Sequence, residues 1–441
     1  MIELHECGPP TRSSPYLNGC LLSDVDSAYI ASRMGSEAAA GCISKLLELL
    51  RIHRFVMSRI CTSNGTEAHM YSYGTPGALL RKNILREWWN HMVSSEENTF
   101  PVEASVVSPD MTDSGISLTL GPREENCKIS GVCLTSSLSK DLLDHYPHSL
   151  QQVNKRLPFA QAAVGTCFQY SRPEFEDNRP SPHRLLSHGL CRTHLVHHYY
   201  SPPGSASQNY DHWLSLRLRW WRQFSSKPSH FVTSNIDAPD GKTTSSIDYM
   251  FPWGQSSIET VCNHGDHDIK QLEEQSGLSH QARVSRKMVY PHVIECQTSL
   301  EDAMAAFLAD AFQEKQIFST NKTIKQNGAR MVLQFHPHLA PYNVSMVNTG
   351  SKSRELRLVT SHWSQDLREA GMRVLDTADV SLTQEAQFRR NDELGIPYTV
   401  VLNDQTLDTG VITIRHRDTM LKEQVHIAKF KERLVRYTSP V

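Results

Sequence analysis

The 441-residue chain has almost no net charge, no closely spaced cysteine pair and no long hydrophobic run. Its 45 Lys and Arg residues nearly balance its 47 Asp and Glu residues, so any attraction to nucleic acid must come from local basic patches. The ten cysteines occur singly, which favours a reducing compartment over a secreted disulfide framework. No apolar segment approaches the roughly 20 residues of a membrane span. We therefore expect a globular chain of two or three domains without membrane attachment.

Several motifs of catalytic and nucleotide sites are also missing. The chain has no Gly-Lys-Ser/Thr phosphate loop and no Gly-x-Ser-x-Gly elbow, which argues against P-loop and serine-hydrolase chemistry. Two groups have spacings that zinc ligands can use, but each lacks a nearby fourth ligand, so we expect no metal. These groups are Cys262, His264 and His267, and His194, His197 and His198.

Hydrophobic spacing predicts the elements of the first two thirds of the chain. Helices are expected over 36–60, from the turn at Tyr73–Gly77 onward, and over 138–156, 208–224 and 299–314. A strand-rich stretch is expected over 157–170. Irregular or exposed segments are expected over 107–137, 172–184 and 319–331, because these are rich in polar and turn-forming residues.

The expected helix over 208–224 combines aromatic and basic residues. Trp213, Leu216, Trp220 and Phe224 form one stripe, and Arg217, Arg219 and Arg222 are expected around the rest of the helix. A core helix with a solvated basic face explains this pattern. Nucleic-acid binding also explains it, because Arg contacts phosphate and Trp stacks on bases. The sequence pattern leaves both interpretations open.

The last hundred residues predict a compact α/β module. Strands are expected over 342–347, 372–375, 398–402 and 411–415, and helices over 352–370, 381–393 and 419–437, with a turn over 404–410. Strands that alternate with helices predict a mixed sheet flanked by helices. No Gly-rich phosphate loop follows any of these strands, so we expect no nucleotide site there.

Residues 392–427 resemble the anticodon-binding domain of glycyl-tRNA synthetase. Upstream, the Tyr73–Gly77 turn with LLRKNILREWW resembles the entry to a class II synthetase core, LPFAQAAVGTCF its motif 2 strand, and PHVIECQTSLEDAMAAFL its motif 3. The resemblance implies an α/β (α+β) fold with an antiparallel-sheet core, helices and a mixed-sheet C-terminal domain. It divides the chain into a poorly ordered tail (1–35), a synthetase-like body (36–335, with the insertion 107–137) and an anticodon-binding-like domain (336–441).

The resemblance also implies that aminoacylation is lost. An active synthetase ends its motif 2 strand with an arginine for the ATP α-phosphate, whereas this chain has Gln169 there. A later Arg-Glu pair aligns on Gly189 and Leu190, and the motif 3 arginine aligns on Asp302. Fixed cations stabilise the negative charge that develops on phosphate, and an acid would repel it. We expect neither catalytic activity nor a cofactor.

Other segments, among them LRKNILREWWNHMV, LRLRWWRQFSSKPSHF and TIRHRDTMLKEQVHIAKFKERLVRY, resemble the accessory subunits of mitochondrial DNA polymerase gamma. This resemblance implies a processivity factor in mitochondrial DNA replication that binds the catalytic subunit through the C-terminal domain and holds primer-template DNA. The DNA-contact candidates are then Arg217, Arg219, Arg222 and Lys227, with Lys322 and Lys325 as a weaker set.

The family resemblance further implies the mitochondrial matrix and its nucleoid, although the N-terminus MIELHECGPP shows no transit peptide. It implies a homodimer through the body, an expectation that the short, polar 107–137 segment weakens. Two alternatives stay open: a divergent glycyl-tRNA synthetase-like enzyme, and a tRNA-binding protein.

Overall fold

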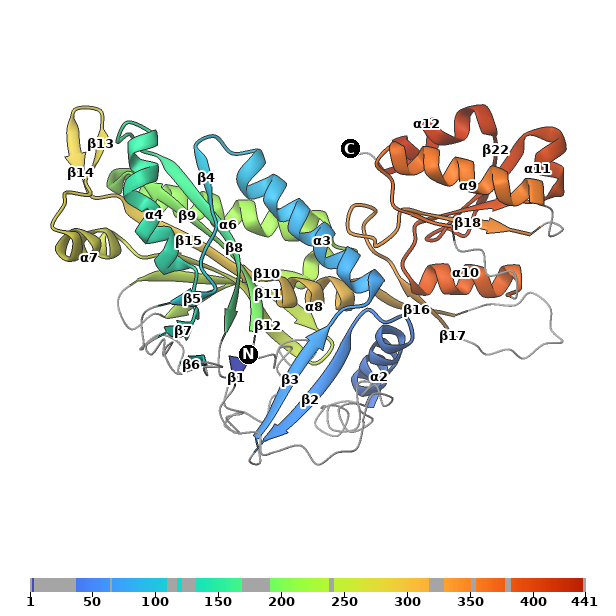
Figure 1. The fold of residues 1–441 in the computed structure, drawn as a ribbon, viewed down its shortest axis with the longest axis horizontal. Coiled ribbons are helices and arrows are strands. Elements are labelled where there is room, and N and C mark those ends of the chain that lie inside the picture. Colours follow the sequence, from blue (N-terminus) through green and yellow to red (C-terminus); the bar gives the residue numbers. More distant parts are fainter. Residues whose placement is uncertain are drawn as a thin grey trace.

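The computed structural model describes residues 2–3, 37–63, 66–108, 117–120, 132–168, 191–237, 242–316, 329–349, 354–376 and 382–438. Figure 1 shows a larger body and a C-terminal domain beside it. Of the expected N-terminal tail, only the short strand β1 (Ile2–Glu3) lies within these residues.

A seven-stranded sheet forms the centre of the body, in the order β10-β11-β12-β15-β9-β8-β4. Its neighbours are antiparallel except for the parallel edge pair β4–β8. The strands are β4 (Thr99–Val102), β8 (Phe159–Phe168), β9 (Cys191–Ser201), β10 (Phe231–Asp237), β11 (Thr243–Phe251), β12 (Gly254–Asn263) and β15 (His292–Ser299). This sheet confirms the predicted antiparallel core.

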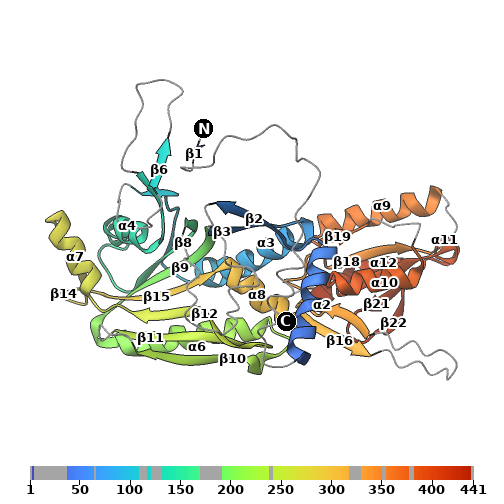
Figure 2. The same ribbon diagram turned by 90° about the horizontal axis from the view of Figure 1, so that it is seen from below.

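Helices cover both faces of the sheet, and Figure 2 shows α4 on one side and α6 on the other. One face carries α4 (Ser139–Gln152), against which α7 (His267–Ser276) packs. The opposite face carries α6 (Ala206–Gln223) and α8 (Leu300–Ala311), and α3 (Thr75–Trp89) packs on α8. The helix α2 (Glu37–Ile52) completes the core with Leu46, Leu49 and Leu50.

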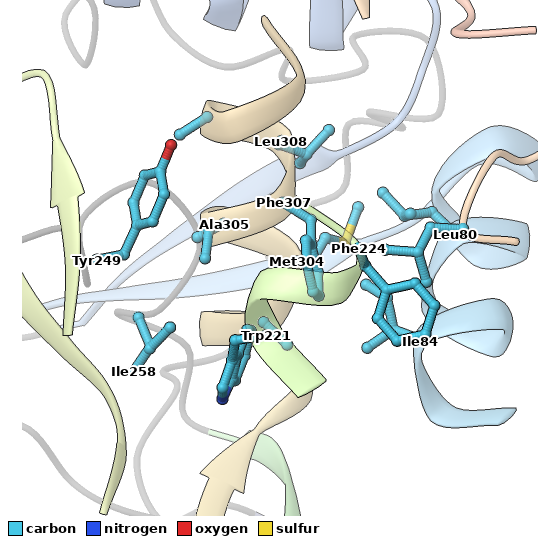
Figure 3. Packing of buried hydrophobic residues seen from close by; sticks show 14 of the residues in the cluster. Leu80, Ile84, Trp221, Phe224, Tyr249, Ile258, Met304, Ala305, Phe307 and Leu308 are labelled. Carbon is cyan, nitrogen blue, oxygen red and sulfur yellow. The ribbon is translucent and has the colours of Figure 1, made fainter. Parts of the chain in front are cut away.

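The helix α8 is the centre of the body's core. Every residue in it except Asp302 is buried, as expected of a helix that is surrounded by protein on all sides. Ser299 caps its N-terminus, because the Ser299 side chain accepts a hydrogen bond from the Asp302 amide. Figure 3 shows Met304 and Phe307 of α8 close to Trp221 of α6 and to Phe224, which follows α6, with Leu80 and Ile84 of α3 at the right.

Smaller elements complete the body. The π-helical turn Asn90–Ser94 continues α3, and the remaining strands form hairpins and a small sheet. These strands are β2 (Met57–Ser63), β3 (Thr66–Ser72), β5 (Val107–Ser108), β6 (Ser117–Leu120), β7 (Val132–Leu134), β13 (Ala282–Val284), β14 (Lys287–Val289), β16 (Phe312–Gln316) and β17 (Ala329–Leu333).

The C-terminal domain is a five-stranded mixed sheet in the order β19-β18-β20-β21-β22, with its own hydrophobic core. The pairs β18–β19 and β18–β20 are parallel, and the pairs β20–β21 and β21–β22 are antiparallel. The elements are β18 (Val344–Asn348), α9 (Arg354–Glu369), β19 (Val374–Leu375), α10 (Gln384–Glu393), β20 (Tyr398–Leu402), α11 (Asp404–Thr409), β21 (Val411–His416), β22 (Lys422–His426) and α12 (Ile427–Thr438). The predicted mixed sheet is confirmed.

Three predicted elements are wrong in extent or type. The helix expected over 36–60 ends at Ile52, and the chain then turns at Arg54, whose φ is +54°, into β2. The turn expected over 404–410 is the helix α11, capped by Asn403. The helix expected over 419–437 begins only at Ile427, because the residues before it pair with β21 as the strand β22.

The C-terminal domain is tied to the body by buried arginines. Arg417, which is 2% exposed, donates hydrogen bonds to the backbone carbonyls of Leu333, Phe335 and Gly395, at 3.1, 2.9 and 2.8 Å. Leu333 ends the β16–β17 hairpin, whereas Gly395 follows α10 of the C-terminal domain. One side chain therefore joins the two parts of the chain.

Two further side chains hold the connection between the parts. Arg373 donates to the carbonyls of Pro337, His338 and Ala340, each at 3.2 Å. Asn83 of α3 donates to the Ala340 carbonyl at 2.9 Å and to that of Leu339 at 3.2 Å. These bonds satisfy the polar backbone of the connecting segment in the interior of the protein.

Candidate functional site

The helix α6 does not present the basic face that its sequence predicts. Arg217 is 0% exposed, and its guanidinium donates to both carboxylate oxygens of Glu259, at 2.6 and 3.0 Å. It also lies over the Trp220 ring, 4.5 Å from the ring centroid. The expectation that Arg217 faces DNA is therefore wrong: a fully buried, bidentate ion pair leaves no donor for an external phosphate.

The other candidates on and after α6 lie in different settings. Arg219 and Arg222 are exposed, but Arg222 donates to the Phe231 carbonyl at 2.7 and 3.2 Å. Lys227 is half-buried, and its ammonium lies 3.5 Å from the Phe312 carbonyl oxygen. Of these three residues, only Arg219 is exposed and makes no hydrogen bond or ion pair with the described part of the chain. Lys322 and Lys325 lie outside the described residues.

A denser group of cations lies at the end of the body opposite the C-terminal domain (Figures 1 and 2). We call this group the basic hairpin patch. It comprises five exposed residues, three from the β13–β14 hairpin and two from the segment after α4: Arg283, Arg286, Lys287, Lys155 and Arg156. Within the described ranges, none of the five forms an ion pair. Because no acid of the described residues pairs with them, they form a local positive field on a nearly neutral chain.

Backbone contacts hold the basic hairpin patch together. Arg283 donates its amide N–H to the Lys155 carbonyl, and Leu157 donates to the Arg283 carbonyl at 3.3 Å. Tyr146 of α4 donates to the His280 carbonyl at 2.9 Å, and Tyr290 donates to Glu273 at 2.9 Å. The cations therefore project from a fixed base. The basic hairpin patch could have been found in the sequence from the run Arg-Val-Ser-Arg-Lys at 283–287, which has three cations in five residues.

The described part of the region that resembles a synthetase active site contains two internal ion pairs. Asp302, in the first turn of α8, pairs with Arg192 of β9 and accepts a hydrogen bond from the Ser299 hydroxyl at 2.8 Å. Beside it, Glu301 pairs with Arg81 of α3 at 2.7 Å and accepts the Thr193 amide N–H at 2.9 Å. Gln169, Gly189 and Leu190 lie outside the described residues.

This arrangement opposes phosphate binding at the N-terminus of α8. The N-terminal end of a helix attracts anions through its free N–H groups and its dipole. Here Glu301 and Asp302 already occupy that end, and the nearby cations Arg81 and Arg192 are bound to them. A phosphate at this end would face the negative charge of both carboxylates.

The three histidines His194, His197 and His198 do not point to one place. His197 lies on the α6 face of β9, where its ring is 4.5 Å from the Trp213 ring, whereas His194 and His198 have the opposite strand parity. His198 contacts Glu295, and His194 contacts Gln297, each at 2.8 Å. Among the residues that the structure covers, no three His, Cys, Asp or Glu side chains are placed to hold a metal ion.

We predict that His197 makes stability depend on pH. Burial lowers the pKa of His197 to about 3, so the folded chain keeps this ring neutral while the unfolded chain protonates it near pH 6.5. The contribution of the neutral His197 ring to the free energy of unfolding is fully present above pH 6.5 and is lost as the pH falls toward the folded pKa. By pH 5 the free energy of unfolding is lower by about 2 kcal/mol. Denaturant unfolding at pH 7 and 5 should show a smaller loss for His197→Phe than for the unmodified chain.

The exposed His212 provides the control for this measurement, since it lies one residue from Trp213 on the outer side of α6. His212→Gln should lose as much stability between pH 7 and 5 as the unmodified chain. An unchanged pH dependence in His197→Phe would contradict the assignment of a neutral, buried ring.

None of the helices within the described residues is long and apolar enough to cross a membrane.

The Anticodon binding domain family matches residues 343–437, which comprise nearly all of the C-terminal domain. A glycine–tRNA ligase of Deinococcus radiodurans is 26% identical, over 67% of this chain and 62% of that protein. These matches agree with the two sheets, and the chain has a class II synthetase-like fold with an anticodon-binding C-terminal domain.

Two other relatives are more similar and match over more of their length. One is the DNA polymerase subunit gamma-2, mitochondrial, of Xenopus laevis, which is 32% identical over 89% of this chain and 87% of that protein. The other is the DNA polymerase subunit gamma-2 of Bos taurus, which is 33% identical over 89% of this chain and 85% of that protein. Since the similarity extends through both the body and the C-terminal domain, this chain belongs to the DNA polymerase subunit gamma-2 family.

Proposed function

We propose that this chain is a non-catalytic accessory subunit of the mitochondrial DNA polymerase, which binds the catalytic subunit and primer-template DNA in the mitochondrial matrix and raises processivity. Its family supports the polymerase partnership, and the C-terminal domain is the part that we assign to the catalytic subunit. The observation that carries the DNA-binding part is the basic hairpin patch, because its five cations are exposed and have no ion-pair partner among the described residues.

The absence of catalysis is also part of the proposal. Asp302 stands where the resemblance expects an arginine, and its pairing with Arg192 supports a structural use of this helix end. Adenylate formation needs cations that are free to contact phosphate. Among the described residues of this region, Arg81 and Arg192 instead pair with Glu301 and Asp302.

Primer extension tests the proposed function. The catalytic subunit is assayed with and without the full chain on a long single-stranded template, at rising salt. We expect longer products and activity at higher salt when the chain is present, because additional phosphate contacts offset the weakening of binding by salt. Equal product lengths with and without the chain at every salt concentration would exclude the accessory role.

The glycine–tRNA ligase relative keeps an enzymatic or tRNA-binding alternative under consideration. Glycine-dependent exchange of pyrophosphate into ATP distinguishes the enzyme, and binding of tRNA at physiological salt distinguishes the RNA-binding protein. We expect no exchange above background. We also expect tRNA to bind no more tightly than duplex DNA of equal charge, since the basic hairpin patch recognises phosphate and not a base sequence.

We predict that the basic hairpin patch supplies phosphate contacts. Replacing Arg283, Arg286 and Lys287 together with alanine should weaken binding of duplex DNA and flatten its salt dependence. Each lost phosphate contact lowers the slope of log affinity against log salt by about 0.9, so the triple variant should lose a slope of about 2 to 3. Fluorescence anisotropy of labelled duplex DNA at several salt concentrations measures this slope.

A matched control removes three exposed cations from α12 instead, at Lys429, Lys431 and Arg436. We expect it to leave the slope nearly unchanged, because these side chains lie in the C-terminal domain, at the other end of the molecule (Figure 1). A second comparison, Arg219→Ala, tests whether α6 supplies a phosphate contact, through the same slope of log affinity against log salt. If the hairpin variant and the α12 variant lose equal slope, binding is diffuse and the patch is not the site.

A further inference from the structure

The chain that follows α4 joins the β13–β14 hairpin through a β-bridge. Arg283 of β13 donates its amide N–H to the Lys155 carbonyl and accepts the Leu157 amide N–H at 3.3 Å. Arg156 therefore lies directly opposite Arg283, in parallel register. On the other side of β13, Met288 of β14 is directly opposite Arg283. Directly opposed residues point to the same face of a sheet, so these three side chains form one row across three neighbouring segments: Arg156, Arg283 and Met288.

This row lies on the outer face of the hairpin. All three of its side chains are exposed, Met288 to 48%. The neighbouring pair, Ala282 and Val289, points to the other face, because successive residues of a strand alternate. Ala282 is fully buried and belongs to the core cluster around Tyr146 of α4. The inner face of the hairpin therefore packs on the body, and a ligand can reach the row from solvent.

The two arginines of the row repel each other. Neighbouring segments of a sheet lie about 4.8 Å apart, and like charges directly opposite each other are destabilising. Glu273 of α7 contacts the residues on both sides of the hairpin, but its oxygens accept the His280 amide N–H and the Tyr290 hydroxyl, each at 2.9 Å. Among the described residues, neither Arg156 nor Arg283 has an ion-pair partner. Their repulsion is therefore not offset within this part of the chain.

The backbone that brings Arg156 to the hairpin is also unusual. Asn154 and Lys155 have φ angles of +53° and +58°, in the left-handed region that residues other than glycine seldom adopt. They turn the chain back after α4, so that the Lys155 carbonyl meets the Arg283 amide. Backbone held in sparsely populated conformations is concentrated at binding sites. Both the charges and the backbone here are arranged at a cost to stability, which indicates a role in binding.

We propose that Arg156 and Arg283 form a site for one phosphate group, which binds between their two guanidinium groups. Each guanidinium presents a planar fork of N–H donors that matches phosphate oxygens. A bound phosphate replaces the repulsion between the arginines with two attractions. The inference rests on the proposed function for its natural ligand, a phosphodiester of the DNA backbone. The site itself does not, because a free phosphate or pyrophosphate ion offers the same oxygens.

Thermal unfolding of the full chain tests the site without DNA. The midpoint is measured at rising sodium pyrophosphate, with sodium chloride adjusted to keep the ionic strength constant. An anion that binds the folded chain raises the midpoint, and the concentration dependence of the rise gives the dissociation constant. Arg156→Gln and Arg283→Gln should each raise that constant about tenfold or more, because each removes charge-assisted hydrogen bonds. Both side chains are exposed and make no hydrogen bond to the described chain, so the variants should fold.

Lys287 provides the matched control. It is exposed and lies on the same hairpin, but it is directly opposite Val284, so its side chain points away from the row. Lys287→Gln removes the same charge as Arg283→Gln and should change the dissociation constant for pyrophosphate by less than about twofold. Equal changes in the lysine and arginine variants would overturn the proposal, since binding would then depend only on total charge.

The salt dependence of duplex DNA binding tests whether both arginines hold the same phosphate. If they do, either single variant still neutralises that phosphate. The slope of log affinity against log salt should then change by less than about 0.5 in each single variant and by about 0.9 in the double variant. A loss of about 0.9 in each single variant and about 1.8 in the double variant would overturn the shared site. Absence of any DNA binding would instead contradict the proposed function, and the pyrophosphate measurement would still decide whether the site exists.

Discussion

Replacement of Glu259 with alanine should destabilise the body by about 3–5 kcal/mol. Glu259 is the counter-charge of the fully buried Arg217, and its Oε2 also accepts the Trp221 indole N–H. The substitution leaves an uncompensated guanidinium and an unpaired N–H in the core, and both are more costly than the lost packing. Urea unfolding followed by tryptophan fluorescence measures the effect, because Trp213, Trp220 and Trp221 all lie in this core.

The double variant Arg217→Met with Glu259→Leu separates the charge from the packing. Removing both partners of a buried ion pair is often neutral or stabilising, so most of the lost stability should return. The control Glu274→Ala, at an exposed glutamate of α7, should change stability by less than about 0.5 kcal/mol. A loss of under about 1 kcal/mol in Glu259→Ala would contradict a buried, charged Arg217.

Replacement of Asp392 with alanine should cost a similar amount at the other end of the chain. Asp392 is 1% exposed, binds Arg415 through both oxygens at 2.9 and 3.1 Å, and also contacts Arg330. Arg330 lies in β17 and Arg415 in β21, so one carboxylate pairs with two buried arginines from two parts of the chain. Its loss leaves two like charges facing each other, and we expect about 3–5 kcal/mol of destabilisation.

Hydrogen exchange locates this second effect, because peptides from β17, α10 and β21 should lose protection while peptides from α6 keep theirs. Asp366→Ala removes a partly exposed carboxylate of α9 that pairs only with His362 among the described residues, and should leave the exchange pattern unchanged. If protection falls equally throughout the chain, Asp392 does not act at the junction.

The placement of Arg217 could have been predicted from the sequence. It follows Trp213 by four residues and precedes Trp220 by three, so it lies on the same stripe of α6 as the tryptophans. Its partner could not have been predicted, because Glu259 lies 42 residues away on β12 and only the sheet brings it beneath α6. An isolated basic residue in an aromatic stripe indicates a buried ion pair as much as a nucleic-acid contact.

The C-terminal domain was predictable where local pattern and tertiary pairing agree. Tyr398–Leu402 is an apolar, β-branched run and forms β20 with the predicted ends. Lys422–His426 has helix-forming residues, and only Val425 among them is buried. The backbone pairing with β21 overrides that propensity, and no local signal reveals it. The basic hairpin patch was missed for a related reason, since Lys155 and Arg156 join Arg283 only through the fold.

The arginine ties between the body and the C-terminal domain have a mechanical consequence. Arg373, Arg417 and Asn83 together bind carbonyls along the connection from Leu333 to Ala340, so this segment cannot bend without breaking several buried hydrogen bonds at once. Bending at this connection, where two domains often have a hinge, therefore carries the cost of several hydrogen bonds. We therefore expect the C-terminal domain to keep a fixed orientation relative to the body, so that the basic hairpin patch and α12 stay a constant distance apart.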